Sequence, residues 1–169
     1  AWIGGRIPIT DLLSEALRRQ LNHSNSNDKP VDMEMKILDP VLLNQQRLSM
    51  IPAENELLIE QVISREGRHL FVFPFEGRFV HEGLAALWSM RFVQREPSTF
   101  SVSVNDYGFE LLAPVDYPFE DGLDEVMTAD PEELEAQVAD AVNLSELTQR
   151  RFRGVAPVSY THLRAHETR

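Results

Sequence analysis

The sequence contains no cysteine, which excludes disulfides, thiolate metal sites and a thiol nucleophile. Lysine is nearly absent too, because only Lys29 and Lys36 occur in 169 residues. No apolar run is long enough to span a bilayer, and no charged segment followed by an apolar one forms a leader. The lack of cysteine fits a reducing compartment, so we expect a cytoplasmic protein without a membrane partner.

Several well-known catalytic and cofactor motifs are also missing. There is no G-x-x-x-x-G-K-[ST] phosphate loop, and neither Gly4-Gly5 nor the pair Gly77 and Gly83 has the spacing of a dinucleotide site. No G-x-S-x-G and no serine, histidine and aspartate order suggests a hydrolase. We therefore expect no cofactor and no catalysis within these residues.

The charge of the chain is strongly negative but uneven. The formal net charge of −11 argues against a domain that binds nucleic acid over its whole surface, because such binding depends on cations that neutralise phosphates. Residues 106–146 hold thirteen acids and no lysine or arginine, whereas residues 65–95 hold five of the fourteen arginines. Any contact with nucleic acid should thus be local and made by arginine.

Hydrophobic periodicity predicts an α+β fold. Alternating and branched residues indicate two antiparallel hairpins, formed by strands at 57–64, 69–75, 100–104 and 109–113. A broad apolar helix from about residue 80 to 96 should join the two hairpins, with further helices packed at both ends. These further helices are expected after Thr10, after Asp32, at Asp39-Pro40, weakly after Pro118, from Pro131 and from Ser145.

The corner after the second strand carries the first candidate site residues. Arg78 lies between His69 and His81, and these side chains could form a small cationic surface against a phosphate backbone. Alternatively they form an internal polar knot, in which Arg78 pairs with Glu82 and His81 satisfies a backbone carbonyl. Arg65 and Arg68, at the tip of the first hairpin, are predicted to be the most accessible basic pair.

Two tryptophans and a set of carboxylates complete the candidates. Trp88 has the position of a core residue, whereas Trp2 sits in a glycine-rich entry, where it could be exposed and stack on a nucleic-acid base. Asp106, Glu110, Glu76 and Glu82 flank turns and could together bind Mg²⁺, as nucleases require. The alternative is that Asp106 caps its turn and the glutamates pair with Arg78 or face water.

The end of the chain differs from the rest. The run VSYTHLRAHET from Val158 resembles an in-frame translation of a transposase sequencing adapter. We therefore divide the chain into a domain over residues 1–157 and a non-native tail over 158–169. This division removes the helical pair His162 and His166 as a metal site.

Two long motifs carry a resemblance to a known family. HLFVFPFEGRFVHEGLAAL, followed by TFSVSVNDYGFELL, resembles the C-terminal, DEAD/H-associated region of bacterial ligase-associated DEXH-box helicases, in the large helicase-related family of superfamily 2. The similarity extends from about Gly4 to Arg153. It implies a truncated accessory domain, incomplete at both ends, of a helicase that couples ATP hydrolysis to movement along single-stranded DNA in repair.

The resemblance also implies partners and site residues. In the family, ATP and Mg²⁺ belong to two RecA-like motor domains followed by a winged helix, which are not in this chain. We expect this region to pack against them and to help hold DNA, with backbone contacts by Arg65, Arg68, Arg78 and His81 and stacking by Trp2. The rival hypothesis is a protein-interaction module whose acidic segment docks a repair partner such as a DNA ligase or a nuclease.

Overall fold

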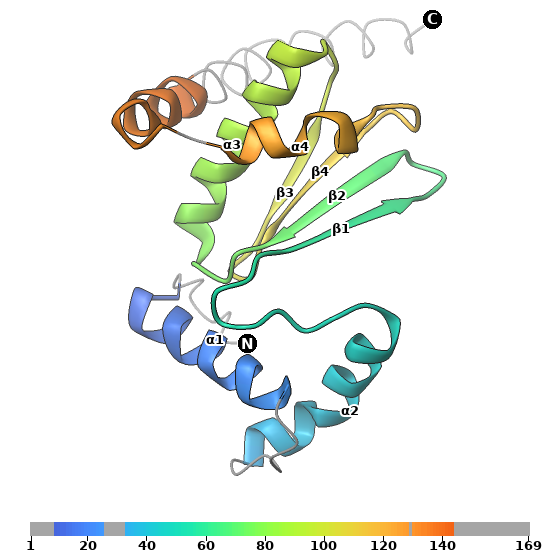
Figure 1. The fold of residues 1–169 in the computed structure, drawn as a ribbon, viewed down its shortest axis with the longest axis vertical. Coiled ribbons are helices and arrows are strands. Elements are labelled where there is room, and N and C mark those ends of the chain that lie inside the picture. The colour runs from blue at the N-terminus through green and yellow to red at the C-terminus, as the bar shows by residue number, and fades with distance from the viewer. Residues whose placement is uncertain (1–8, 26–32, 129, 144–169) are drawn as a thin grey trace, which may run out of the picture.

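The computed structural model describes residues 9–25, 33–128 and 130–143, and its ribbon is shown in Figure 1. It combines helices with one antiparallel sheet, so the predicted α+β class is confirmed. The elements follow one another in this order: α1 (Asp11–Asn25), α2 (Met33–Leu48), β1 (Leu58–Ile63), β2 (Arg68–Phe73), α3 (Arg78–Arg95), β3 (Ser101–Val104), β4 (Phe109–Ala113), α4 (Phe119–Met127) and a helix over residues 131–143.

The two predicted hairpins join into a single four-stranded sheet with the strand order β1-β2-β4-β3. The join is the antiparallel pairing of β2 with β4, in which Leu70 lies opposite Leu111. A Cβ atom at Gly108 would lie 2.2 Å from the backbone oxygen of Val72, so only glycine allows the two central strands to approach here. Gly67 has φ 148° in the tip of the first hairpin, as its turn position predicts.

The core lies between one face of the sheet and helices α3 and α4, as Figure 1 shows. Leu70 and Val72 from β2 and Leu111 from β4 are fully buried there, and Trp88 of α3 packs edge-on against Phe109 with ring centroids 5.5 Å apart. The prediction that Trp88 is a core residue is therefore confirmed. Burial of each such large apolar side chain contributes about 1.5–3 kcal/mol to stability.

A second aromatic group extends this core to α4. It consists of Phe92, Phe100, Tyr117 and Phe119, whose ring centroids lie 4.9 to 6.1 Å from one another. The Tyr117 hydroxyl donates a 2.9 Å hydrogen bond to the backbone oxygen of Phe92, and burial raises the pKa of this phenol. The sequence predicts only a weak helix after Pro118, but buried Phe119 and Val126 make α4 a regular helix.

The prediction of two short helices around Asp39-Pro40 is wrong. One helix, α2, runs through this position with Pro40 inside it. Proline lacks the N–H group that would have bonded to the carbonyl of Lys36, and its ring crowds that carbonyl, yet the helical backbone continues on both sides.

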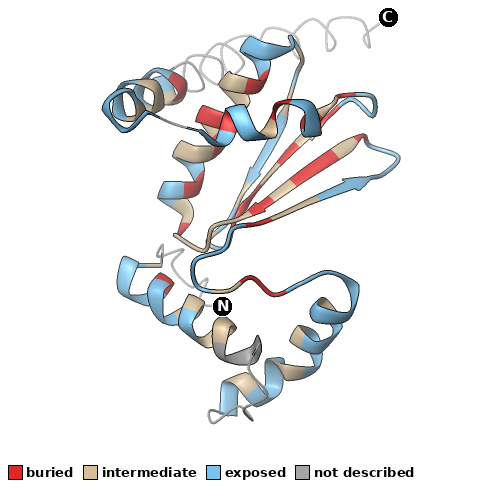
Figure 2. Cartoon of the chain, in the orientation of Figure 1, coloured by how far each residue is buried: buried red, intermediate tan, exposed pale blue. Residues whose placement is uncertain are grey.

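Helices α1 and α2 lie apart from the core, at the end of the sheet where β2 turns into α3 (Figure 1). α2 has no buried residue, and Figure 2 shows both helices mostly in the exposed colour. α1 reaches the sheet end through an ion pair between Arg18 and Glu76. Within the described ranges, no helix is both long and apolar enough to cross a membrane.

Candidate nucleic-acid interface

The corner between β2 and α3 is built from two residues with left-handed backbone. Phe75 has φ 56° and Gly77 has φ 87°. Phenylalanine at positive φ is uncommon, and such a conformation persists only when the surroundings hold it in place. A Cβ atom at Gly77 would lie 3.0 Å from the backbone oxygen of Ile9, so the segment before α1 closes over the corner.

His81 holds this corner from inside. The backbone N–H of Glu76 donates to His81 Nε2 at 3.0 Å, and His81 Nδ1 lies 2.8 Å from the backbone oxygen of Asn105, to which it donates. The ring is fully buried, and its burial lowers its pKa, although the bond to Asn105 and the charge of Asp106 act in the opposite direction. His81 is thus a neutral side chain whose two ring nitrogens are both hydrogen-bonded to the backbone. Because the ring is buried, a phosphate could reach it only if the corner opened.

Arg78 is the first residue of α3 and is only partly buried. Its Nε atom is buried and has no hydrogen-bond partner among the described residues. The alternative pairing with Glu82 is not among the ion pairs found in the described part of the chain, and Glu76 pairs with Arg18 instead. The knot expected from the sequence therefore exists for His81 but without Arg78.

The N-terminus of α3 adds to the positive charge of Arg78. Gly77 offers no side chain that could cap the helix, and the first turn contains no acid. The free N–H groups and the dipole of a helix make such an end attractive to an anion. Arg78 and this helix end together resemble a site for a single phosphate.

The two arginines at the tip of the first hairpin differ from each other. Arg68 donates to the backbone oxygen of Val115 at 3.2 Å and to both carboxylate oxygens of Glu120 at 2.8 and 3.0 Å, and its side chain is only 19% exposed. Arg65 is exposed, and no polar contact of its side chain is found within the described residues. The prediction of an accessible basic pair is therefore wrong for Arg68, because α4 supplies an acid that the sequence spacing does not reveal.

The remaining candidate residues, which include the carboxylates predicted to bind Mg²⁺, do not form one site. Glu110 bonds His69 and Glu76 pairs with Arg18, and no group of three or more metal-ligating side chains converges anywhere in the described ranges. The Mg²⁺ cluster is thus contradicted for the described residues. Trp2, the histidine pair near the C-terminus and the tail over 158–169 lie outside the described residues.

Sequence reasoning also missed how the arginine-rich and acidic segments contact each other. Arg68 pairs with Glu120, and Arg95 pairs with Glu125, so two acids of α4 are matched to arginines of the earlier segment. The backbone N–H of Glu120 and, next, the bond from Arg68 hold the pKa of Glu120 below its usual range. No local pattern could reveal these pairs, because their members are 52 and 30 residues apart.

A second missed feature is a row of rings that runs along β2 and continues to Phe75 in the corner. His69, Phe71, Phe73 and Phe75 stack in order, with centroids 5.7, 6.4 and 6.3 Å apart. Their period of two in the sequence was the available signal, because alternate residues of a strand point to the same face.

Comparison with known proteins decides the family. Residues 51–169 match the family model described as DEAD/H associated. The chain belongs to this family. The DEAD/H associated part of the resemblance drawn from the two long motifs is thereby confirmed.

Two curated relatives and one solved structure extend this result. The "ATP-dependent helicase Lhr-Core" of Methanocaldococcus jannaschii is 26% identical over all of this chain and 21% of its own length. "ATP-dependent helicase Lhr-Core protein 2" of Thermococcus barophilus is 23% identical over 92% of this chain and 20% of its own length. The DEAD/H associated chain therefore spans about a fifth of these relatives.

The structural relative shares the fold. The helicase Lhr of Mycobacterium smegmatis, solved bound to ssDNA and AMP-PNP, matches 83% of this chain and 19% of its own with a TM-score of 0.65 and 21% identity. A domain of this fold is thus present in a helicase that was solved with bound single-stranded DNA.

Proposed function

We propose that this domain is the DNA-engaging and scaffolding accessory part of an ATP-dependent helicase that acts in DNA repair in the cytoplasm. ATP and Mg²⁺ would bind to motor domains outside this chain. This domain packs against those motor domains and against a winged-helix domain. The observation that carries the proposal is the uncapped, acid-free start of α3 with Arg78 beside it. The names of the helicase relatives and the DNA-bound structural relative support it.

The candidate residues take different roles in this proposal. Arg78 and the first N–H groups of α3 bind a phosphate, and Arg65 contacts the backbone at the hairpin tip. Arg68 joins them only when DNA displaces it from Glu120. His81 fixes the corner that presents Arg78, and Trp2 stacks on a base.

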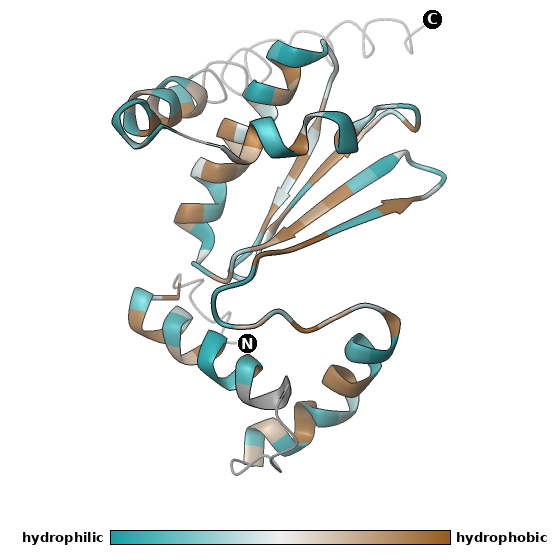
Figure 3. Ribbon diagram, viewed as in Figure 1, coloured by the Kyte–Doolittle hydropathy of each residue, from teal (hydrophilic) through white to brown (hydrophobic). Residues whose placement is uncertain are grey.

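The scaffolding role is supported by the apolar surface of the first two helices. Leu12 is 78% exposed on α1, and Met33, Ile37 and Leu48 are 68 to 72% exposed on α2. Figure 3 shows this apolar colour along α2, away from the core. Exposed apolar surface of this kind marks sites of protein contact, which fits packing against other domains of a helicase.

The test is the salt dependence of single-stranded DNA binding by the whole chain, followed by fluorescence anisotropy. We expect Arg78→Gln to weaken binding and to reduce the slope of log K against log salt by about 0.7, the value for one lost phosphate contact on a single strand. Arg47→Gln is the matched control, since Arg47 is exposed at the end of α2. Equal slopes for Arg78→Gln and the unmodified chain would remove Arg78 from the interface.

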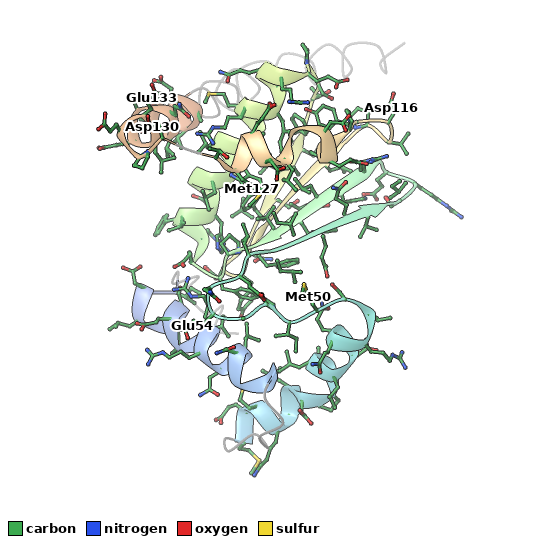
Figure 4. All side chains as sticks on the ribbon, viewed as in Figure 1. Met50, Glu54, Asp116, Met127, Asp130 and Glu133 are labelled. Carbon is green, nitrogen blue, oxygen red and sulfur yellow. The ribbon has the colours of Figure 1, made fainter. Side chains whose placement is uncertain are left out.

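The second candidate function is a docking module for a repair partner. It is favoured by the exposed acids at the last described helix, among them Asp130 just before it and Glu133 within it, both labelled at the upper left of Figure 4. If it is correct, a purified DNA ligase or nuclease from the same genome binds the chain. That binding weakens in Glu132→Gln/Glu135→Gln and persists in Arg78→Gln.

A further inference from the structure

The sheet has a second face, opposite the core, and the aromatic row lies on it. Leu70 and Val72 of β2 point into the core beneath α3 and α4, so the alternate residues His69, Phe71 and Phe73 point to the other face. β2 is a central strand of the sheet. Phe71 and Phe73 are half-buried, and their rings are nearly parallel to their neighbours, with interplanar angles of 5, 17 and 27° along the row.

The outer end of the row is held by hydrogen bonds. His69 Nδ1 lies 2.6 Å from Glu110 Oε1, and its Nε2 lies 2.6 Å from Ser64 Oγ. Because an ionised carboxylate only accepts hydrogen bonds, Nδ1 carries the proton and the serine hydroxyl can donate to Nε2. Both ring nitrogens therefore have partners, and the imidazole plane lies nearly parallel to the ring of Phe71.

The charged groups around the row are carboxylates and not cations, and the Gln45 amide of α2 donates to Glu60 Oε1 at 3.1 Å. The register places Glu60 of β1 and Glu110 of β4 on either side of Phe71. Ser103 of β3 lies beyond Glu110 on the same face. At the described strand positions of this face there is no lysine or arginine, so the face offers rings and carboxylates but nothing that attracts phosphate.

We propose that this face stacks the bases of a single-stranded nucleic acid and recognises them by their edges. The sheet has four antiparallel strands, with helices on one face and aromatic rings on a central strand of the other face. Unpaired bases stack on aromatic side chains in sheets of this arrangement. The inference rests on the proposed engagement of DNA and deepens it, because it assigns the bases to the sheet and the phosphates to Arg78 and the start of α3.

The carboxylates determine which bases fit. Glu60 and Glu110 can accept hydrogen bonds from the amino groups of cytosine, adenine and guanine. Glu110 uses Oε1 for His69 and Glu60 uses Oε1 for Gln45 of α2, and each carboxylate has further acceptor positions. Thymine offers no amino group, so strands of dC or dA bind more tightly than strands of dT.

The experiment separates base contacts from phosphate contacts. Binding of the whole chain to dC, dA, dT and abasic oligonucleotides of one length is measured by anisotropy, at low and at high salt. Stacking is expected to make dC bind about tenfold more tightly than the abasic strand, and this ratio should persist at high salt because it involves no phosphate. An rC strand tests whether the sugar contributes to binding. If rC, like dC, binds about tenfold more tightly than an abasic strand of the same sugar, the result supports recognition of the base.

Two variants test the assignment. Phe71→Leu should remove most of the difference between dC and the abasic strand, whereas Phe100→Leu, an equally half-buried ring on the core side, should not. Glu60→Gln should reduce the preference for dC over dT. Thermal melting identifies any variant that has not folded. If Phe71→Leu has not folded, Phe73→Leu replaces it.

The results distinguish the inference from the function on which it rests. Equal binding of dC and abasic strands, or no effect of Phe71→Leu and Phe73→Leu, overturns base stacking. If Arg78→Gln still reduces the salt slope in that case, the proposed DNA contact stands alone. A folded chain that binds no strand at all overturns both.

Discussion

The sheet with α3 and α4 differs from the helical pair α1 and α2 in how it uses apolar residues. In the first region Phe92, Leu111 and Phe119 are fully buried. In the second, α2 buries no residue, and its Ile37 is 71% exposed. The helices of both regions carry apolar residues, so the difference lies in the surfaces against which those residues can pack.

This difference shows that amphipathic pattern and core formation are separate properties. α1 and α2 have the spacing of helices that pack, yet within the described chain their contacts are few: with each other, with Glu76 at the end of the sheet, and through Gln45 with Glu60 of β1. Most helix stability in proteins comes from packing of the apolar face. The sheet with α3 and α4 therefore carries the stability of this chain, whereas the helical pair offers surface to something else.

The largest expected effect is the removal of a core ring. Phe92→Ala should destabilise the chain by about 3–5 kcal/mol, because a fully buried phenylalanine leaves a cavity among its aromatic neighbours. Urea unfolding followed by circular dichroism measures the change. A loss below 1 kcal/mol would mean that the aromatic group is not the centre of the fold.

An intermediate effect is expected at the corner that connects the two regions. His81→Ala should cost about 1–3 kcal/mol, since it leaves the N–H of Glu76 and the carbonyl of Asn105 without their partner. The effect should also depend on pH. Burial lowers the pKa of His81 in the folded chain, so the unfolded chain binds this proton more readily. The free energy of unfolding should therefore be constant with respect to His81 above about pH 6.5, the ordinary pKa of histidine, and should fall as the pH decreases below it.

The pH dependence has a simple measurement. Urea midpoints between pH 5 and 8 should decrease toward low pH more steeply in the unmodified chain than in His81→Ala. His69 is present in both proteins, so its contribution is common to the two curves. Parallel curves would show that His81 titrates alike in the folded and unfolded states.

The smallest expected effect is in the helical pair. Ile37→Ala should change stability by no more than about 0.5 kcal/mol, because the side chain is exposed and alanine is a better helix former. The same urea experiment measures it, with Phe92→Ala as the reference. A loss as large as 2 kcal/mol would remove the contrast between the two regions.

The strands and α3 could be predicted because their signals are local. Alternation located β3 and β4 within a residue, and Pro74 and Pro97 marked where β2 and α3 end. The pairing of β2 with β4 could not be predicted, since it depends on which edges meet after α3 has formed.

The candidate site was predicted in part, for a related reason. The sequence correctly indicated that His81 could satisfy a backbone carbonyl. It could not show that Arg68 forms an ion pair with Glu120, because that contact depends on where α4 packs. The ring row was visible as a period of two along β2, but its face could be assigned only once the core side was known.

The strand order has a consequence for how the chain folds. Each hairpin pairs neighbours in the sequence, whereas β2 and β4 must close a loop that contains α3 and β3. Local hairpins form within about 1–10 μs, and closing a longer loop adds an entropic cost that only later contacts repay. We therefore expect the two hairpins to form first and the pairing of β2 with β4 to follow, once α3 has docked.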